Sequence, residues 1–233
     1  MGEISINPKF NIHETYKKVR ILNPYRNSGA PSGGVMPRSE NLIRFYKFNE
    51  TTGDAIDEIG TQNGVLYNTI VRDGSSYEGN GTNAYVDAGF TSETTKYSIA
   101  TRIMTGADVS GVKFIASKYI NSSDRSVYFY ISSGRFAAQS GSVLVLSSGI
   151  TPNTAYEIVI TCNNESLGTI KIYLTKALEH SRNTEIIPAT NIPLNLFRRN
   201  YNAYYANVKI DYFAMWDVEL TQAEIDTIPE GSL

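Results

Sequence analysis

The residue types best suited to recognising a ligand gather in two segments of this sequence, 119–125 and 197–207. A tyrosine ring offers a flat apolar face, and arginine, asparagine and aspartate offer hydrogen-bond donors and acceptors beside it. This combination suits contact with a glycan or with a protein surface. The alternative is that these tyrosines pack in the core or at its rim. The candidate ligand-binding residues are Tyr119, Asn121, Asp124, Arg125, Arg198, Arg199, Asn200, Tyr201 and Tyr204.

Catalytic chemistry finds little support in the sequence. Retaining glycoside hydrolysis needs two carboxylates about 5 Å apart. The closest acidic string is Glu224, Asp226 and Glu230, but it lies in a helical pattern and its last member follows a proline. His13 and His180 are the only histidines, one in the N-terminal segment and one in an expected surface loop. We therefore expect no enzyme; a glycan-active hydrolase with another kind of site is an alternative.

The single cysteine, Cys162, lies in an apolar strand pattern. A nucleophilic thiol needs a polar, cationic setting, so we expect a buried and unreactive one. One cysteine also excludes an internal disulfide framework.

Calcium is the one cofactor that the sequence suggests. Ca²⁺ takes six to eight oxygen ligands, often from aspartate and asparagine side chains and loop carbonyls. The alternative is that such residues form turns and hold no metal. The candidate ligands are Asp54, Asp57, Asn63, Asp87 and Asp211.

The strongest structural pattern lies near the C-terminus. Residues 208–216 alternate in period two, and both faces are largely apolar, which predicts a strand covered on both sides. One face is expected to carry Val208, Ile210, Tyr212, Ala214 and Trp216. Thr221 and Glu224 have the capping-box spacing, which predicts a short helix that Pro229 ends. So short a helix must lean on the strand before it.

The middle of the chain predicts about a dozen short strands separated by turn residues. The expected strands are 41–49, 65–71, 84–88, 97–104, 112–118, 126–132, 135–139, 143–146, 155–162 and 169–175. Their alternation places apolar residues on one face of each strand: Tyr97, Ile99 and Ile103 in 97–104, Tyr156, Ile158, Ile160 and Cys162 in 155–162, and Ile170, Ile172 and Leu174 in 169–175. The fold class predicted is all-β: a two-sheet antiparallel jelly-roll sandwich with one short C-terminal helix and an extended N-terminal arm.

Two distant groups of residues carry a resemblance to a known family. The first group is the segment 45–54, followed by 57–64 and 77–87; the second is 210–216 followed by 220–225. In this order, the sequence resembles the laminin-G-like domains of the concanavalin A-like lectin/glucanase superfamily over about residues 41–230. The resemblance implies a final strand followed by a short helix, ligands at the concave face and rim loops, and often a calcium at the sandwich edge.

The first 40 residues differ from residues 41–233, which we expect to form the sandwich domain. They hold four of the eight prolines and carry a net charge of +3, against −2 for the whole chain. This pattern favours an extended basic arm and linker that docks on a protein partner and becomes ordered there; the alternative is a disordered leader or a first strand of the sandwich. The candidate docking residues are Lys9, Tyr16, Lys17, Lys18 and Arg20.

The function hypothesis is a non-enzymatic, lectin-like module that binds a glycan or cell-surface polysaccharide and docks on a larger assembly. Neither a signal peptide nor a membrane span is expected, which makes a virion surface attractive, such as a phage capsid decoration or tail adhesin. The net charge excludes an overall nucleic-acid footprint. The alternative is a structural sandwich that cements subunits and binds no glycan.

Overall fold

The computed structural model describes residues 35–60, 62–90, 95–119, 125–165, 168–184, 192–199 and 202–229. The chain divides into two compact units, Met1–Pro31 and Ser32–Leu233. All described residues belong to the second unit. The candidate docking residues Lys9, Tyr16, Lys17, Lys18 and Arg20 lie outside the described residues, as does His13, so the docking role stays a prediction.

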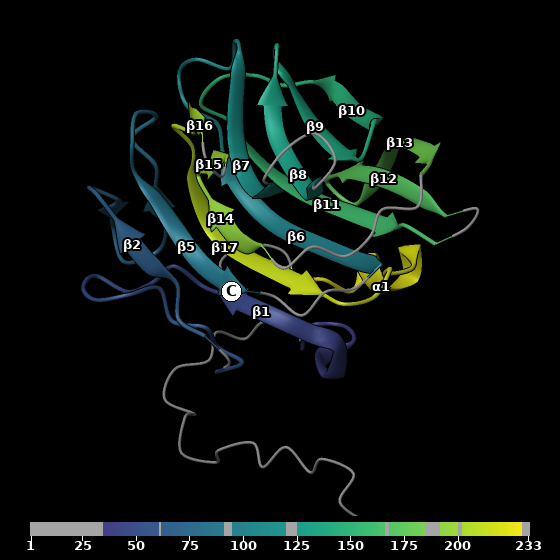
Figure 1. Ribbon diagram of the computed structural model, residues 1–233, viewed down its shortest axis with the longest axis horizontal. Helices are drawn as coiled ribbons and strands as arrows, with labels where there is room; N and C mark the ends of the chain where they lie inside the picture. The colour runs from purple at the N-terminus through teal and green to yellow at the C-terminus, as the bar shows by residue number, and fades with distance from the viewer. Residues whose placement is uncertain are drawn as a thin grey trace, which may run out of the picture. The chain divides into compact units, whose positions relative to one another are not determined.

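Two antiparallel sheets form a sandwich, as the sequence predicted (Figure 1). Among the described residues, one sheet has eight strands in the order β13 (Ala177–Asn183), β12 (Thr169–Leu174), β11 (Ala155–Asn163), β6 (Lys96–Met104), β17 (Lys209–Trp216), β4 (Tyr77–Glu78) and β3 (Val71–Arg72), with β1 (Leu42–Tyr46) also paired to β17. Short helices are η1 (Ser39–Asn41) and α1 (Gln222–Asp226).

The second sheet has nine strands among the described residues. Their order is β10 (Val143–Gly149), β9 (Arg135–Ser140), β8 (Arg125–Ser132), β7 (Val112–Tyr119), β14 (Pro193–Leu196), β5 (Tyr85–Phe90) and β2 (Val65–Tyr67), with β15 (Arg198–Arg199) paired to β16 (Asn202–Tyr205). β16 also pairs with β7 in parallel, through Tyr205 and Phe114. That pairing brings the segment of the predicted ligand residues onto this sheet.

Strand β17 lies inside its sheet, as its two apolar faces predicted. It runs along β6 over most of its length, and its other edge is shared by β4 at its start and β1 at its end. Figure 1 shows β6 and β17 side by side. The two distant segments that carry the family resemblance therefore meet in one sheet, where Ile210 pairs with Tyr77.

The prediction that apolar residues alternate without a break along β17 is wrong, because the strand contains one irregularity. The register with β6 shifts between Ile210 and Tyr212, which marks a β-bulge. Ile210 therefore packs between the sheets with Phe213, whereas Tyr212 and Trp216 pack on the outer face. A bulge adds one residue to a strand, so period two holds on each side of it but not across it.

The prediction of a single strand over residues 65–71 is also wrong, because the structure has two strands there, β2 and β3. β2 pairs with β5 in the nine-stranded sheet, and β3 pairs with β4 in the eight-stranded sheet. Asn68 lies between them with a φ of 57°, a left-handed conformation that asparagine tolerates better than most residues. The chain changes sheets at this turn.

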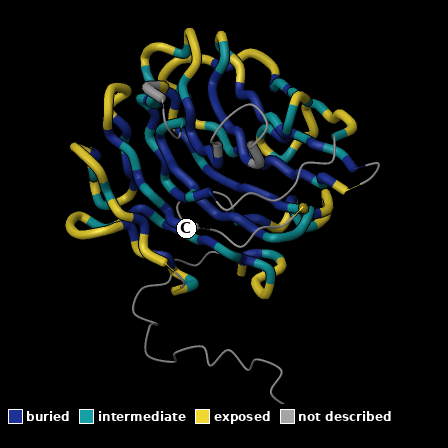
Figure 2. The backbone as a smooth tube through the Cα atoms, viewed as in Figure 1, coloured by how far each residue is buried: buried dark blue, intermediate teal, exposed yellow. Residues whose placement is uncertain are grey.

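The main core lies between the two sheets and contains the apolar residues that alternation predicted, among them Ile99, Ile103, Ile158 and Ile172. Figure 2 shows buried residues following the strands, with exposed residues mostly in the connections. Fully burying one such side chain contributes about 1.5–3 kcal/mol. No helix of the described residues is long and apolar enough to cross a membrane.

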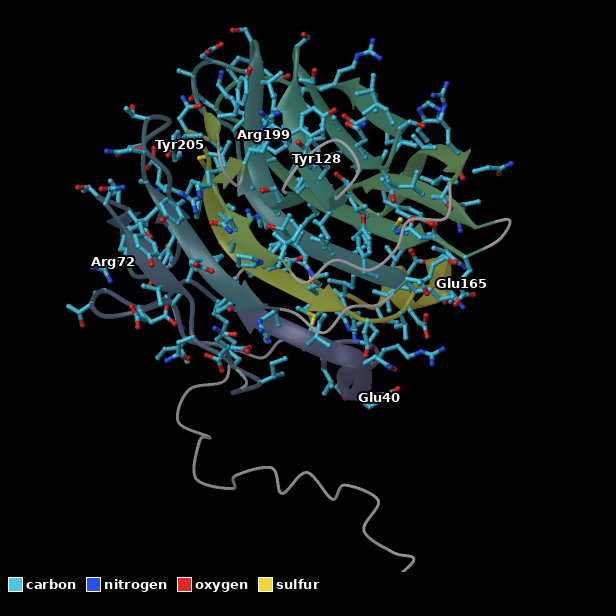
Figure 3. The ribbon with its side chains drawn as sticks, viewed as in Figure 1. Glu40, Arg72, Tyr128, Glu165, Arg199 and Tyr205 are labelled. Atoms are coloured by element: carbon cyan, nitrogen blue, oxygen red, sulfur yellow. The ribbon has the colours of Figure 1, made fainter. Side chains whose placement is uncertain are left out.

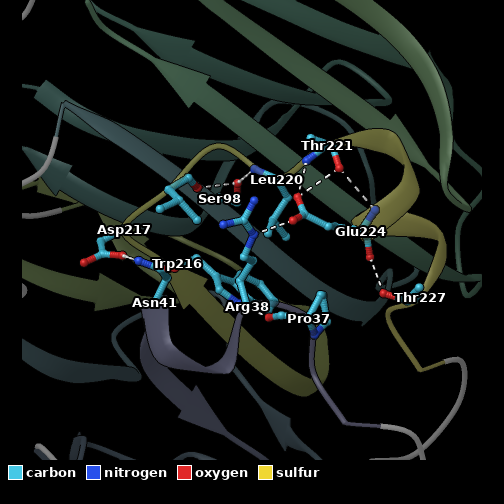
Figure 4. Close-up of polar contacts among 11 residues, drawn as sticks. Pro37, Arg38, Asn41, Ser98, Trp216, Asp217, Leu220, Thr221, Glu224 and Thr227 are labelled. Carbon is cyan, nitrogen blue, oxygen red and sulfur yellow. Dashed lines mark hydrogen bonds and ion pairs between the residues drawn. The ribbon is translucent and has the colours of Figure 1, made fainter. Parts of the chain in front are cut away.

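A second apolar cluster lies on the outer face of the eight-stranded sheet, beneath α1. Trp216 and Tyr212 pack there with Ile225 of the helix and with Met36. Met36 belongs to a short segment, residues 36–41, which we call the strap. Figure 4 shows the strap beside the helix, with Arg38 directed at Glu224, its ion-pair partner. The compact unit therefore includes residues that precede position 41.

The capping box of α1 is confirmed. The Thr221 hydroxyl accepts a hydrogen bond from the Glu224 backbone N–H, and the Glu224 carboxylate accepts one from the Thr221 N–H at 2.8 Å. Burial of Ile225 and Ile228 holds the helix on the sheet. Glu224 is thus committed to structure, as the sequence indicated.

Candidate functional site

The segment predicted as a ligand loop, 197–207, forms the short hairpin β15–β16. Phe197 begins it with a φ of 67° and a fully buried ring. Its N–H donates to the Ile115 carbonyl, and its carbonyl accepts from the Ala206 N–H, both at 2.8 Å. Phe197 therefore packs in the core, the alternative that the sequence left open for aromatic residues of this segment, and anchors the hairpin there.

Arg198 continues a stack of aromatic rings on β2 and β5. Its guanidinium carbon lies 3.3 Å from the centroid of the Tyr85 ring. Tyr85 stacks in turn on Tyr67, with centroids 4.5 Å apart and planes 4° from parallel. The Arg198 Nε donates to the Asn195 Oδ1 at 2.8 Å, which fixes the guanidinium over the ring. Burial raises the pKa of Tyr85.

Arg199 links a second aromatic group on the same sheet. Its guanidinium carbon lies 4.8 Å from the Tyr204 ring centroid and 5.7 Å from that of Phe114. Phe114 also stacks on Tyr130 at 4.9 Å and meets Tyr128 edge-on at 4.7 Å. Figure 3 labels Arg199 and Tyr128 on this part of the sheet. Such contacts hold aromatic rings and guanidinium groups in defined orientations.

A cavity of about 320 Å³ lies beside Tyr204. Its lining includes Asn80, Asp108, Lys113, Tyr204, Tyr205 and Asn207. Tyr204 is 44% exposed, so its ring is accessible at the cavity's edge. The volume lies at the lower end of the range that small-ligand pockets occupy, about 300–1,000 Å³. We call this the Tyr204 cavity.

Among the described residues that line the Tyr204 cavity, the lysine is paired. The Lys113 Nζ lies 2.8 Å from the Asp108 Oδ2 and donates to the Ser110 carbonyl at 2.6 Å. The hydrogen bond from Lys113 lowers the pKa of Asp108, with further bonds from Ser110 acting in the same direction. The cavity therefore presents a balanced ion pair, two amides and two tyrosines.

The structure brings together three of the predicted ligand residues, Arg198, Arg199 and Tyr204, in one hairpin. Tyr119 and Arg125 pair at the facing ends of β7 and β8, but their side chains are outside the description. Asn121, Asp124, Asn200 and Tyr201 lie outside the described residues, so their role stays a prediction.

Sequence reasoning missed the polar residues that line the Tyr204 cavity. Asn80, Asp108 and Asn207 lie in three connections that are far apart in the chain. Each has the appearance of an ordinary turn residue, and the pairing of strands alone brings them together. The one local signal in the sequence that could have indicated this cavity is the five-residue spacing of Asp108 and Lys113, which form an ion pair.

The oxygen atoms of the candidate calcium ligands accept hydrogen bonds within the protein. The Asp57 Oδ1 accepts from the Phe45 and Ile59 N–H groups, and Asn63 accepts from the Asp57 N–H. The Asp87 Oδ1 accepts from the Gly89 N–H at 2.8 Å. These bonds are the turn-forming role that the sequence left as the alternative.

The same five candidates do not converge. Asp87 lies on β5 and Asp211 on β17, in different sheets, and Asp211 pairs with Arg102 at 3.3 Å. No group of three or more histidine, cysteine, aspartate or glutamate residues in the described part of the chain could hold a metal ion. Calcium binding by Asp54, Asp57, Asn63, Asp87 and Asp211 stays a prediction.

The described residues that were considered for catalysis are buried, paired on a strand or hydrogen-bonded within the protein. Cys162 is fully buried, and burial raises the pKa of its thiol to about 11. His180 was expected in a loop; that is wrong, because it lies on β13, where Ile172 is its partner. Glu224 belongs to the capping box, and the Asp226 Oδ1 accepts a hydrogen bond from Gln222 at 2.8 Å. Glu230 lies outside the described residues.

A laminin-G-type family model, described as the concanavalin A-like lectin/glucanases superfamily, matches residues 76–226. The chain belongs to this superfamily. The resemblance read from the sequence is thereby confirmed. No curated protein matches the sequence.

Solved structures with this fold include an enzyme and receptor-binding domains. Trypanosoma rangeli sialidase in complex with sialic acid is similar with a TM-score of 0.67 at 11% identity, over 86% of this chain and 34% of that one. The receptor binding domain of botulinum neurotoxin type G has a TM-score of 0.61 at 18% identity, over 80% of this chain and 50% of that one.

The ligand binding domain of botulinum neurotoxin serotype D, in complex with N-acetylneuraminic acid, has a TM-score of 0.62 at 13% identity, over 80% of this chain and 50% of that one. The chain thus spans a third to a half of the length of these structures. At such identities the likeness shows the lectin-like fold that the chain shares with them.

Proposed function

We propose that this protein is a non-enzymatic carbohydrate-recognition module that binds a glycan at the Tyr204 cavity. The observation that carries the proposal is the position of Tyr204, exposed at the cavity's edge and stacked near Arg199. Its ring can cover the C–H face of a sugar. The Asn80 Oδ1 is engaged by three backbone N–H groups, but its Nδ2, which gives one hydrogen to the Asn83 Oδ1, keeps a second hydrogen that can bind a hydroxyl group.

The fold supports this proposal. Two of the similar solved structures, the T. rangeli sialidase and the serotype D neurotoxin domain, hold sialic acid or N-acetylneuraminic acid. One of these is an enzyme and the other a binding domain, so the fold is compatible with either. The binding role is favoured because Glu224 forms the capping box of α1, Cys162 is buried and His180 lies on β13, paired with Ile172.

The proposal is tested by glycan-array binding and calorimetry with purified protein. We expect Tyr204→Ala to reduce glycan affinity about tenfold or more, which corresponds to about 1.4 kcal/mol. Tyr204→Phe keeps the stacking ring and should retain most of the affinity. Leu178→Ala is the matched control, since Leu178 is 52% exposed on β13, a strand that does not line the cavity.

Two results would contradict the proposal. Unchanged binding by a folded Tyr204→Ala protein would remove the cavity from recognition. A folded wild-type protein that binds no glycan would favour the structural, subunit-cementing role instead. Release of reducing sugar on incubation with the bound glycan would show an enzyme rather than a binding module.

We further propose that the basic N-terminal arm predicted for residues 1–40 docks this module on a larger assembly, such as a virion surface, through the part that precedes the strap, residues 1–31. The support is the basic, proline-rich composition of this segment. Co-sedimentation of the full chain and of a chain lacking residues 1–31 with the source particles tests it. Equal co-sedimentation of the two proteins would refute the docking role.

A further inference from the structure

A second cavity, of about 480 Å³, adjoins the Tyr204 cavity. Its lining includes Glu78, Met104, Asn153, Lys209 and Asn207. Asn207 lines both cavities, so they meet at this residue. We call the two together the Asn207 groove. It crosses from the β15–β16 hairpin to the start of β17, at one end of the sandwich.

Asn207 is held at this boundary by two glycines. A Cβ added at Gly106 would lie 2.4 Å from the Asn207 carbonyl oxygen, and one added at Gly81 would lie 3.0 Å from the Asn207 Cβ. Such distances leave no room for a side chain at Gly106. Backbone from two other connections therefore clamps Asn207, and the division of the groove into two parts is a fixed feature.

The amide of Asn207 has unused hydrogen-bonding capacity. Within the described residues, its Oδ1 is buried and has no hydrogen-bond partner. A buried polar atom left without a partner costs about 1–3 kcal/mol. Because this atom is buried, a sugar hydroxyl would remove that cost only when the Asn207 amide turns toward one of the two cavities.

The charges of the groove are paired. Lys113 is neutralised by Asp108, as described above, and the Lys209 Nζ lies 2.8 Å from the Asp73 Oδ2. Glu78 adds a further carboxylate to the second cavity. Among the described residues that line the groove, both lysines have an acidic partner, so neither is free to pair with the carboxylate of an acidic sugar, and Glu78 would repel that carboxylate.

Apolar surface accompanies the polar atoms in both cavities. Met104 is 43% exposed in the second cavity, and Val112 is 40% exposed beside Tyr204 in the first. Alternating apolar and hydrogen-bonding surface suits the C–H faces and hydroxyl groups of successive sugar rings.

We infer that the Asn207 groove binds a neutral oligosaccharide whose consecutive units occupy both cavities. This inference rests on the proposed function and adds two properties to it, chain length and absence of charge. A ligand that reaches both cavities buries more surface than a monosaccharide can at Tyr204 alone. Affinity should therefore rise with length.

Calorimetry with neutral oligosaccharides of one to four units, and with their sialylated counterparts, tests the inference. We expect affinity to rise about tenfold or more between one and three units, with no gain from sialylation. Met104→Ala should weaken the longer ligands more than the monosaccharide, whereas Tyr204→Ala should weaken all lengths. Leu178→Ala should change neither, because Leu178 lies outside the groove.

Equal affinity at all lengths would overturn the inference and leave glycan recognition at Tyr204 intact. Tighter, salt-sensitive binding of sialylated ligands would overturn it in the same way, because it would reveal a cationic site. Failure of every glycan to bind the folded protein would instead overturn the proposed function, and this inference with it.

Discussion

The indole N–H of Trp216 donates a 2.7 Å hydrogen bond to the backbone carbonyl of Pro37, 179 positions earlier in the chain (Figure 4). The bond ties the strap to the last strand of the sandwich. Asn41 adds a side-chain hydrogen bond to Asp217 at 3.0 Å. Residues that precede the first strand thus complete the cover of the outer face, and their removal should expose Trp216.

The strap should contribute measurably to stability. Met36 is only 7% exposed and packs in the cluster beneath α1. We expect Met36→Ala to lower the free energy of unfolding by about 2 kcal/mol, since truncating a buried methionine leaves a cavity. Denaturant unfolding followed by fluorescence of Trp216, the only tryptophan, measures it.

The matched control for the strap is its neighbour Val35, which is 83% exposed. Val35→Ala should leave the unfolding free energy within about 0.5 kcal/mol of wild type. Equal effects of the two substitutions would show that Met36 is not packed on the sandwich.

The capping box should set the stability of α1. Thr221→Ala removes the hydroxyl that accepts from the Glu224 N–H and should cost about 1 kcal/mol. Thr221→Ser keeps the hydroxyl and should behave as wild type. Thermal unfolding of the three proteins compares them, and a Thr221→Ala protein with wild-type stability would rule out a role for the cap.

Gly106 should tolerate no side chain. Its added Cβ would meet the Asn207 carbonyl oxygen at 2.4 Å, so Gly106→Ala must displace backbone and should destabilise the protein by about 1–3 kcal/mol. Gly149 is the control, because a Cβ there meets nothing within 4 Å. Calorimetric unfolding of both variants gives the comparison; a neutral Gly106→Ala would mean that Asn207 is not clamped.

The pKa of Asp73 should depend on Lys209. The hydrogen bond from Lys209 is the largest cause that lowers it, and Ser75 adds further bonds. Lys209→Ala should raise the pKa of Asp73 toward its ordinary value, measured by NMR titration of the carboxyl carbon. An unchanged titration curve would show that the pair does not form in solution.

The lowered pKa of Asp73 also determines how its contribution to stability changes with pH. Asp73 has a lower pKa in the folded than in the unfolded chain, so its contribution is present above the unfolded pKa and is lost as pH falls through the folded value. Because the pair is largely exposed, we expect a small effect. It should appear only in acid, and Lys209→Ala should reduce it, while the hydrogen bonds from Ser75 keep part of it.

The sandwich itself could be predicted because its signals are local. Alternation placed Ile158, Ile160 and Cys162 on the inner face of β11, where they lie. Thr221 and Glu224 identified the helix start, since a capping box needs only four consecutive residues. The bulge after Ile210 escaped prediction because it depends on the pairing partner, β6, and not on the strand alone.

The candidate site was predictable only in part. Arg198, Arg199 and Tyr204 were recognised because they are neighbours in sequence. The groove was not, because Asn207 meets Gly81 and Gly106 only after the strands have paired. The sequence left the position of Phe197 open for a related reason: its left-handed backbone turns an aromatic ring inward within a segment rich in polar residues.

The burial of Cys162 has a practical consequence for studying this protein. The chain has no other cysteine, and this thiol is fully buried with a pKa of about 11. A maleimide dye or spin label would therefore attach almost exclusively to a cysteine introduced at the surface. Distances between such a label and Trp216 could then be followed in the native chain without first removing any residue.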